Sequence, residues 1–145
     1  MTMLSAHFSL EELTFSQTAI RYGIDNTPSQ FARLNLDVLA PGLEQVRTLL
    51  GYPMRISSGY RCPKLNKLLR GAANSAHMKG LAADFTCPGF GPPTAIAAVI
   101  NHSDIEFDQL IQEGAWVHIA FALVPRRQVL TAHFGPTGTT YSAGV

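Results

Sequence analysis

The chain has 145 residues, a length at which one domain can bury a hydrophobic core without disulfides or structural metals. Hydrophobic residues make up 46% of it and charged residues 14%, a composition typical of globular and not of disordered proteins. The 11 basic and 10 acidic side chains give a formal net charge of +1, so the charge balance does not indicate a nucleic-acid partner. No apolar run has the length of a membrane span, and MTMLSAHFSLEEL lacks the features of a signal peptide. We predict one domain, residues 1–145, made in the cytoplasm, without a membrane partner.

Two capping boxes predict helices in the first third of the chain. SLEE at 9–12 fits the motif, and so does TPSQ at 27–30, where Thr27 is the expected cap and Pro28 suits the first helical position. Apolar residues at three- and four-residue steps extend the second helix to Gly51, and Pro41 is expected to kink or divide it.

The rest of the chain predicts mainly strands. We expect strands at 53–58, 81–87 and 128–134, helices at 63–71 and 92–102, and a hairpin of 107–113 with 116–123 around the turn Gly114-Ala115. Residues 135–145 are expected to form a flexible tail. Helices that precede antiparallel strands predict an α+β fold, with helices packed on a small antiparallel sheet.

Three polar residues stand out because of their surroundings. His77 and Asp84 lie seven positions apart in GAANSAHMKGLAADF, where they could form an ion pair, an acid–base couple or part of a metal site. His118 lies within the apolar strand WVHIAF, where a buried imidazole needs a polar partner.

The predicted hairpin adds a carboxylate to this group. With Gly114 and Ala115 as the turn, Ile111 faces His118 and Glu113 faces Trp116, so Glu113 and His118 project from the same side of the sheet. Two histidines and an aspartate are a plausible ligand set for catalytic zinc, which usually leaves a fourth position to water and lowers the pKa of that water. A nearby carboxylate can then transfer the proton. The alternative is a buried His–Asp hydrogen bond with an unrelated core histidine.

The segments SSGYRCPKLNKLL, SAHMKGLAADF and WVHIAF together resemble the peptidase M15 family, the zinc D-Ala-D-Ala carboxypeptidases and peptidase endolysins of bacteriophages. The resemblance covers roughly residues 8–122, with a motif core at 53–122. It implies a hedgehog/D-Ala-D-Ala peptidase-like fold. It also implies that His77, Asp84 and His118 bind one Zn²⁺.

The resemblance gives further residues a role. Arg61 matches the arginine that steadies the substrate or its developing oxyanion, a task that suits a planar, permanently charged group. Ser75 matches a substrate-binding position of some relatives. Tyr60 and Trp116 are further candidates for substrate binding: Tyr60 would support the arginine or fill the core, and Trp116 would line the substrate groove or pack in the core.

The general base is where the sequence departs from many relatives. They carry it three positions before the last histidine, and that position is Ala115 here. Others carry it five positions before, which is Glu113 and agrees with the hairpin geometry. Asp108 is the second candidate.

The resemblance implies a zinc metallopeptidase that hydrolyses peptidoglycan stem peptides, as a D-Ala-D-Ala carboxypeptidase or an L-Ala-D-Glu endopeptidase. We expect a monomeric phage or prophage lysis enzyme that reaches the cell wall after holin-type release. The alternative is a non-catalytic, zinc-stabilised module that binds the cell wall or a protein.

Overall fold

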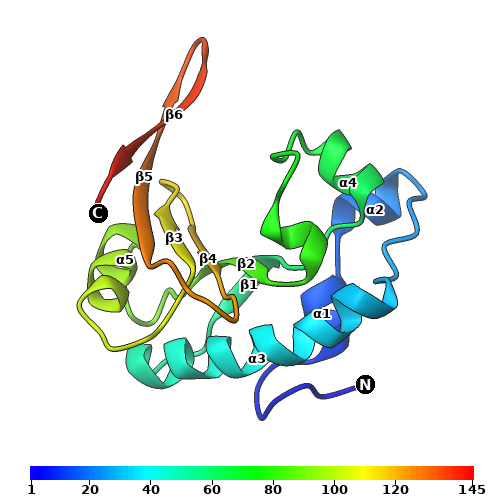
Figure 1. Ribbon diagram of the computed structural model, residues 1–145, viewed down its shortest axis with the longest axis horizontal. Helices are drawn as coiled ribbons and strands as arrows, with labels where there is room; N and C mark the ends of the chain where they lie inside the picture. The colour runs from blue at the N-terminus through cyan, green and yellow to red at the C-terminus, as the bar shows by residue number, and fades with distance from the viewer.

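A computed structural model describes residues 1–145 and shows five α-helices, one 3-10 helix and six strands (Figure 1). The helices are α1 (Leu10–Thr14), α2 (Gln17–Arg21), α3 (Gln30–Leu50), α4 (Pro63–Leu68) and α5 (Pro93–Asn101), with the 3-10 helix η1 (Ala76–Lys79). The strands are β1 (Arg55–Ser58), β2 (Ala82–Thr86), β3 (Gln109–Gln112), β4 (Val117–Ala120), β5 (Gln128–Gly135) and β6 (Gly138–Ala143). The predicted α+β class is confirmed. None of the helices combines the length and hydrophobicity that a transmembrane span requires.

The six strands form one sheet in the order β1-β2-β4-β3-β5-β6. All neighbours are antiparallel except β3 and β5, which run parallel, so the sheet is mixed. The predicted hairpin is present in the predicted register: Ile111 pairs with His118, and the Glu113 N–H donates to the Trp116 carbonyl at 3.0 Å.

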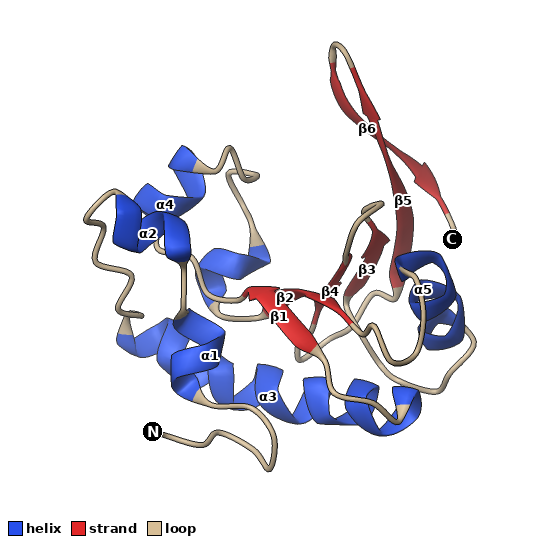
Figure 2. Cartoon of the chain, turned by 180° about the vertical axis from the view of Figure 1, so that it is seen from behind, coloured by secondary structure: helices blue, strands red, loops and turns tan.

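The two faces of the sheet serve different purposes. One face is buried against α3 and α5, which lie beside the sheet in both views (Figures 1 and 2). Its core side chains from the strands are Ala83, Phe85, Leu110, Val117 and Ile119. Because side chains alternate along a strand, the intervening residues point to the opposite face. Asp84 and His118 belong to that opposite face.

Helix α3 differs from its prediction in two details. Its cap is Ser29, whose Oγ accepts the Ala32 N–H at 3.1 Å, and not Thr27. Thr27 instead donates its N–H and hydroxyl to Asp25, at 2.9 and 2.7 Å, in a turn before the helix. The helix is also continuous from Gln30 to Leu50, so Pro41 does not divide it.

The prediction of a flexible tail is wrong for residues 138–143. They form β6, which pairs with β5 along its length in a hairpin that projects from the body of the molecule (Figures 1 and 2). One side-chain contact joins its strands, with His133 Nε2 2.7 Å from Ser142 Oγ, and Thr131 of β5 donates to the carbonyl of Gly144, just after β6, at 2.7 Å. We call residues 128–143 the C-terminal hairpin.

Candidate metal centre

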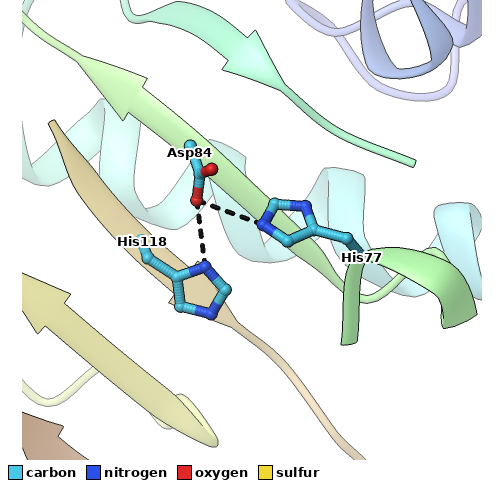
Figure 3. Close-up of side chains that lie close together, drawn as sticks. All are labelled: His77, Asp84 and His118. Carbon is cyan, nitrogen blue, oxygen red and sulfur yellow. Dashed lines mark hydrogen bonds and ion pairs between the residues drawn. The ribbon is translucent and has the colours of Figure 1, made fainter. Parts of the chain in front are cut away.

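His77, Asp84 and His118 meet in one buried group (Figure 3). They come from η1, β2 and β4, and their potential ligand atoms all lie within 4.8 Å of one another. His118 Nδ1 is 2.9 Å and His77 Nε2 is 3.2 Å from the same oxygen of Asp84, Oδ1. The three residues predicted from the sequence are therefore brought together.

Strand register and a short turn position these side chains. Asp84 and His118 are directly opposite each other in the antiparallel pair β2–β4, so they share a face. His77 lies on η1, where Ser75 Oγ accepts the His77 N–H at 3.2 Å and Gly80 ends the turn in the left-handed conformation, with φ 75°. A Cβ at Gly80 would lie 2.5 Å from the Ala32 carbonyl oxygen, so glycine lets η1 pack directly on α3.

The backbone around Gly59 fixes the orientation of the His77 ring. His77 Nδ1 lies 2.7 Å from the Gly59 carbonyl oxygen, and because a carbonyl can only accept, Nδ1 carries the proton. Gly59 in turn packs against α1, where an added Cβ would lie 2.3 Å from the Leu13 carbonyl oxygen. This contact explains why the loop after β1 has glycine at this position.

The environment of the His77 ring favours a cation beside its Nε2 atom. Burial lowers the pKa of His77, an effect that the nearby Asp84 opposes only in part, so the ring is neutral at neutral pH. With the proton on Nδ1, the Nε2 lone pair faces Asp84 Oδ1, also an acceptor, at 3.2 Å. Two buried acceptors that face each other in this way are well placed to bind one metal cation together.

The donor set also fits zinc. In tetrahedral zinc sites with ligand atoms about 2.1 Å from the metal, the ligand atoms lie about 3.4 Å apart. The two histidine nitrogens lie 2.9 and 3.2 Å from Asp84 Oδ1, and all three residues are buried. Nitrogen and carboxylate ligands suit zinc, although they also admit other divalent ions.

Arg61 completes the inner part of the site. Its NH2 group is 3.2 Å from Asp84 Oδ2, and its Nε donates to Ser58 Oγ at 3.0 Å, so both ends of the guanidinium are oriented. Burial opposes ionisation of Asp84, but the hydrogen bond with His118 and the proximity of His77 outweigh it and hold the pKa of the carboxyl well below its ordinary value. Asp84 is therefore an anion throughout the physiological pH range.

The metal group opens into a cavity of about 690 Å³. Its floor is the face of the sheet that carries Asp84 and His118. One wall is formed by the segment 69–79, which follows α4, contains η1 and includes Arg70 and Lys79, and the other by the C-terminal hairpin. The cavity has the size and polar lining of a small-molecule or peptide site.

Glu113 lies on this floor, as the hairpin geometry predicted. Burial raises the pKa of Glu113, and the negative charge of Asp84 raises it further, against smaller opposing effects of His118, Trp116 and Arg61. The Trp116 indole N–H is buried without an acceptor in hydrogen-bonding geometry, although it is near enough to Glu113 to favour the anion. A carboxyl whose pKa is raised toward neutrality is suited to general acid–base chemistry.

Asp108, the second candidate for the base, has a different environment. Arg126 Nε and NH2 lie 2.9 Å from its two carboxylate oxygens, in a bidentate pair. The Arg126 hydrogen bond holds the pKa of Asp108 below its ordinary value. Asp108 lines the cavity but is a weaker base than Glu113.

The predicted substrate-binding residues have different positions. Ser75 and Trp116 line the cavity, and Ser75 also caps the turn that carries His77. Tyr60 does not line it: it is 4% exposed and packs in the hydrophobic core. Of the two roles expected for Tyr60, the structure shows core packing.

Sequence reasoning missed the outer part of the cavity. Phe134 and Tyr141 line it from the C-terminal hairpin, and Arg126 borders it from the loop before β5. The segment HFGPTGTTYSA does not alternate hydrophobic with polar residues, so it gives no basis for a strand prediction. Every residue from 133 to 143 is exposed, and neither face of this strand pair has to be hydrophobic. The two aromatic residues within it were the available signal.

The fold and the buried His–Asp–His group define a candidate metalloprotein with a substrate-sized cavity beside its metal ligands. The model of the family Peptidase M15 matches residues 6–120, most of the chain and all three ligands. The chain belongs to the peptidase M15 family. Membership implies a metallopeptidase that acts on peptides. No curated protein matches the chain closely enough to be counted as a relative.

Proposed function

We propose that the protein is a zinc metallopeptidase that hydrolyses the stem peptides of bacterial peptidoglycan. The observation that carries the proposal is the position of Glu113, a half-buried carboxyl with a raised pKa, in the same cavity as three buried metal ligands. Family membership supports the peptidase chemistry. The choice of peptidoglycan rests on the resemblance of the three sequence motifs to wall peptidases.

The residues divide the reaction between them. His77, Asp84 and His118 would hold the metal, which when bound supplies Lewis-acid polarisation of the scissile carbonyl. Glu113 accepts a proton from the attacking water and returns it to the leaving amine. Arg61, fixed by Ser58 and Asp84, stabilises the negative charge that develops on the carbonyl oxygen.

The rival function is a non-catalytic, zinc-stabilised module that binds the cell wall or a protein. Such a module needs the three ligands but has no use for a carboxyl of raised pKa in an open cavity. Glu113 therefore favours the enzyme, and its conservative replacement separates the two functions.

We further propose that the protein is a phage or prophage lysis enzyme that crosses the membrane by holin-type release. This setting follows from the endolysins among the M15-like proteins that the motifs resemble. If it is right, cytoplasmic expression leaves cells intact until a holin is co-expressed, whereas expression with an export signal lyses them directly.

Mass spectrometry of purified peptidoglycan tests the enzymatic proposal. Zinc-loaded protein is incubated with walls of several peptide types, with and without a chelator. New peptide termini that disappear with the chelator support the proposal, and their masses identify the bond. Walls that stay intact while the protein retains its zinc would favour the binding module.

A further inference from the structure

Strand register extends the face of the metal centre onto the C-terminal hairpin. In the row His118–Ile111–Leu130, the partners in β4, β3 and β5 share a face with the ligand His118. The next row toward the β3–β4 turn contains Glu113 on one side and the pair Ala132–Tyr141 on the other. Because Ala132 is small, little side chain separates Tyr141 from Glu113.

The environment of Tyr141 agrees with this register. Burial raises the pKa of its phenol, and the charge of Glu113 raises it further, so the two side chains are close enough to interact. Tyr141 nevertheless remains 54% exposed as a residue, and both residues line the cavity. The phenol is therefore available for a ligand beside Glu113.

Phe134 forms an aromatic wall with Trp116 one row further out. Their ring centroids are 6.4 Å apart at an interplanar angle of 51°, and the Phe134 ring also approaches Gly114 in the β3–β4 turn. Phe134 shares the cavity face with its partner Thr139 and is 60% exposed. Aromatic side chains left exposed on the face of a site are typical of ligand contacts.

We propose that the C-terminal hairpin binds the part of the substrate on the leaving-amine side of the scissile bond. Tyr141 hydrogen-bonds the peptide beside Glu113, and Phe134 with Trp116 contacts the residues further along. The inference rests on the proposed peptidase function, in which Glu113 protonates the leaving amine. It goes beyond family membership, because the hairpin lies outside the matched residues 6–120.

The hairpin has a consequence for the bond that is cut. A carboxypeptidase releases one residue, which would occupy only the space beside Glu113 and Tyr141. Only a longer leaving group extends far enough outward to contact Phe134. The protein therefore cleaves inside the stem peptide, with several residues on the leaving side.

Peptide binding tests this without relying on turnover. Trp116 is the only tryptophan of the chain and lines the cavity, so its fluorescence reports occupancy. The zinc-loaded Glu113→Gln protein is titrated with two N-acetylated peptides, L-Ala-D-Glu-L-Lys-D-Ala-D-Ala and the shorter L-Ala-D-Glu. We expect the longer peptide to bind at least about tenfold more tightly, a difference of about 1.4 kcal/mol.

Variants of the hairpin locate the source of this preference. Adding Phe134→Ala should reduce the preference to less than about threefold, and adding Tyr141→Phe, which keeps the ring, should weaken both peptides alike. Thr140→Ala is the matched control: Thr140 pairs with His133, on the opposite face, and is exposed. Circular dichroism and thermal unfolding verify that each variant retains the fold.

The outcomes separate this inference from the proposed function. Length-dependent binding that Phe134→Ala abolishes supports the hairpin even if wild-type protein cleaves neither peptide, in which case the proposed peptidase function fails alone. Equal binding of the two peptides, binding of neither, or a preference that persists in Phe134→Ala would overturn the role of the hairpin.

Discussion

At the scale of single residues, the proposed reaction depends on Glu113, which must stay free of the metal to accept a proton. Glu113→Gln removes the proton acceptor while keeping the shape of the side chain. We expect kcat to fall by about 10²–10⁴, the usual contribution of a general base, with unchanged zinc content by plasma mass spectrometry. Glu106→Gln, the same change at an exposed position outside the cavity, is the control. A fully active Glu113→Gln protein would exclude Glu113 as the base.

The pH dependence of the reaction follows from the same residue. Glu113 acts as a base only when ionised, and burial with the charge of Asp84 raises its pKa above the ordinary 4.5. We expect kcat/KM to rise with pH along an acid limb that reports the ionisation of Glu113, which burial moves upward and the charge of a bound metal moves downward. The residual activity of Glu113→Gln should lack this limb, and an unchanged limb would assign it to another group.

Gly59 is predicted to support the metal through the backbone. In Gly59→Ala the new methyl group meets the Leu13 carbonyl oxygen, and the loop must move, taking with it the carbonyl that orients His77. We expect a loss of about 1–3 kcal/mol in stability and about 10–100-fold in zinc affinity. Chemical denaturation and competition with a zinc chelator measure these losses.

The control for this change is Gly135→Ala. A Cβ at Gly135 meets its nearest neighbour, the Gly138 carbonyl oxygen, at an ordinary 3.5 Å. Stability and zinc affinity should stay close to wild type. If both glycine variants weakened zinc equally, the Gly59 carbonyl would not be the cause.

At the scale of elements, the cap of α3 gives a direct test. Ser29→Ala removes the acceptor of the Ala32 N–H and should cost about 1 kcal/mol in the free energy of unfolding. Thr27→Ala, which leaves that acceptor in place, should cost less. Urea denaturation measures both, and a larger loss for Thr27→Ala would place the cap where the sequence motif suggested.

The elements also show what the sequence could predict. The position of Glu113 beside His118 was predictable because strand alternation and the two-residue turn determine which side chains share a face, whereas the family resemblance supplied the set of three metal ligands. The cap of α3 was not, because Thr27 and Ser29 both suit that role and only Asp25, which binds Thr27, decides between them.

Contacts distant in sequence account for the remaining differences. The parallel pairing of β3 with β5 depends on an edge that exists only once β3 has joined the sheet. The same holds for the Gly59 carbonyl, which is 18 residues from His77 in the chain. Family resemblance supplied the role of Arg61, and the structure adds its contacts with Ser58 and Asp84.

At the scale of the whole molecule, the metal-free protein should lose stability on acidification. The pKa of His77 is lowered from 6.5 and that of Asp84 from 3.8, so the unfolded chain binds more protons than the folded protein below these values. Stability therefore rises with pH across this range and falls as the pH drops from 7 toward 4.

The ionisation of Glu113 has the opposite effect on stability, because a raised pKa makes the folded protein less stable as the pH rises. The measurement is therefore best made in the Glu113→Gln protein. Urea denaturation at several pH values should give a curve that His77→Gln flattens near pH 6.5. A curve that His77→Gln leaves unchanged would show that burial of His77 does not couple folding to pH.

The sheet gives the molecule two separate tasks on its two faces, a packed core on one and the metal group with its cavity on the other. The central claim, that this second face is a metal-dependent peptidase site, is tested most directly by titrating zinc into chelator-treated protein while peptide hydrolysis is measured. We predict that activity rises linearly with added zinc and reaches a plateau at one equivalent per protein. The Asp84→Asn protein should recover no activity. Hydrolysis that persists without metal, or none at saturating zinc, would contradict the account.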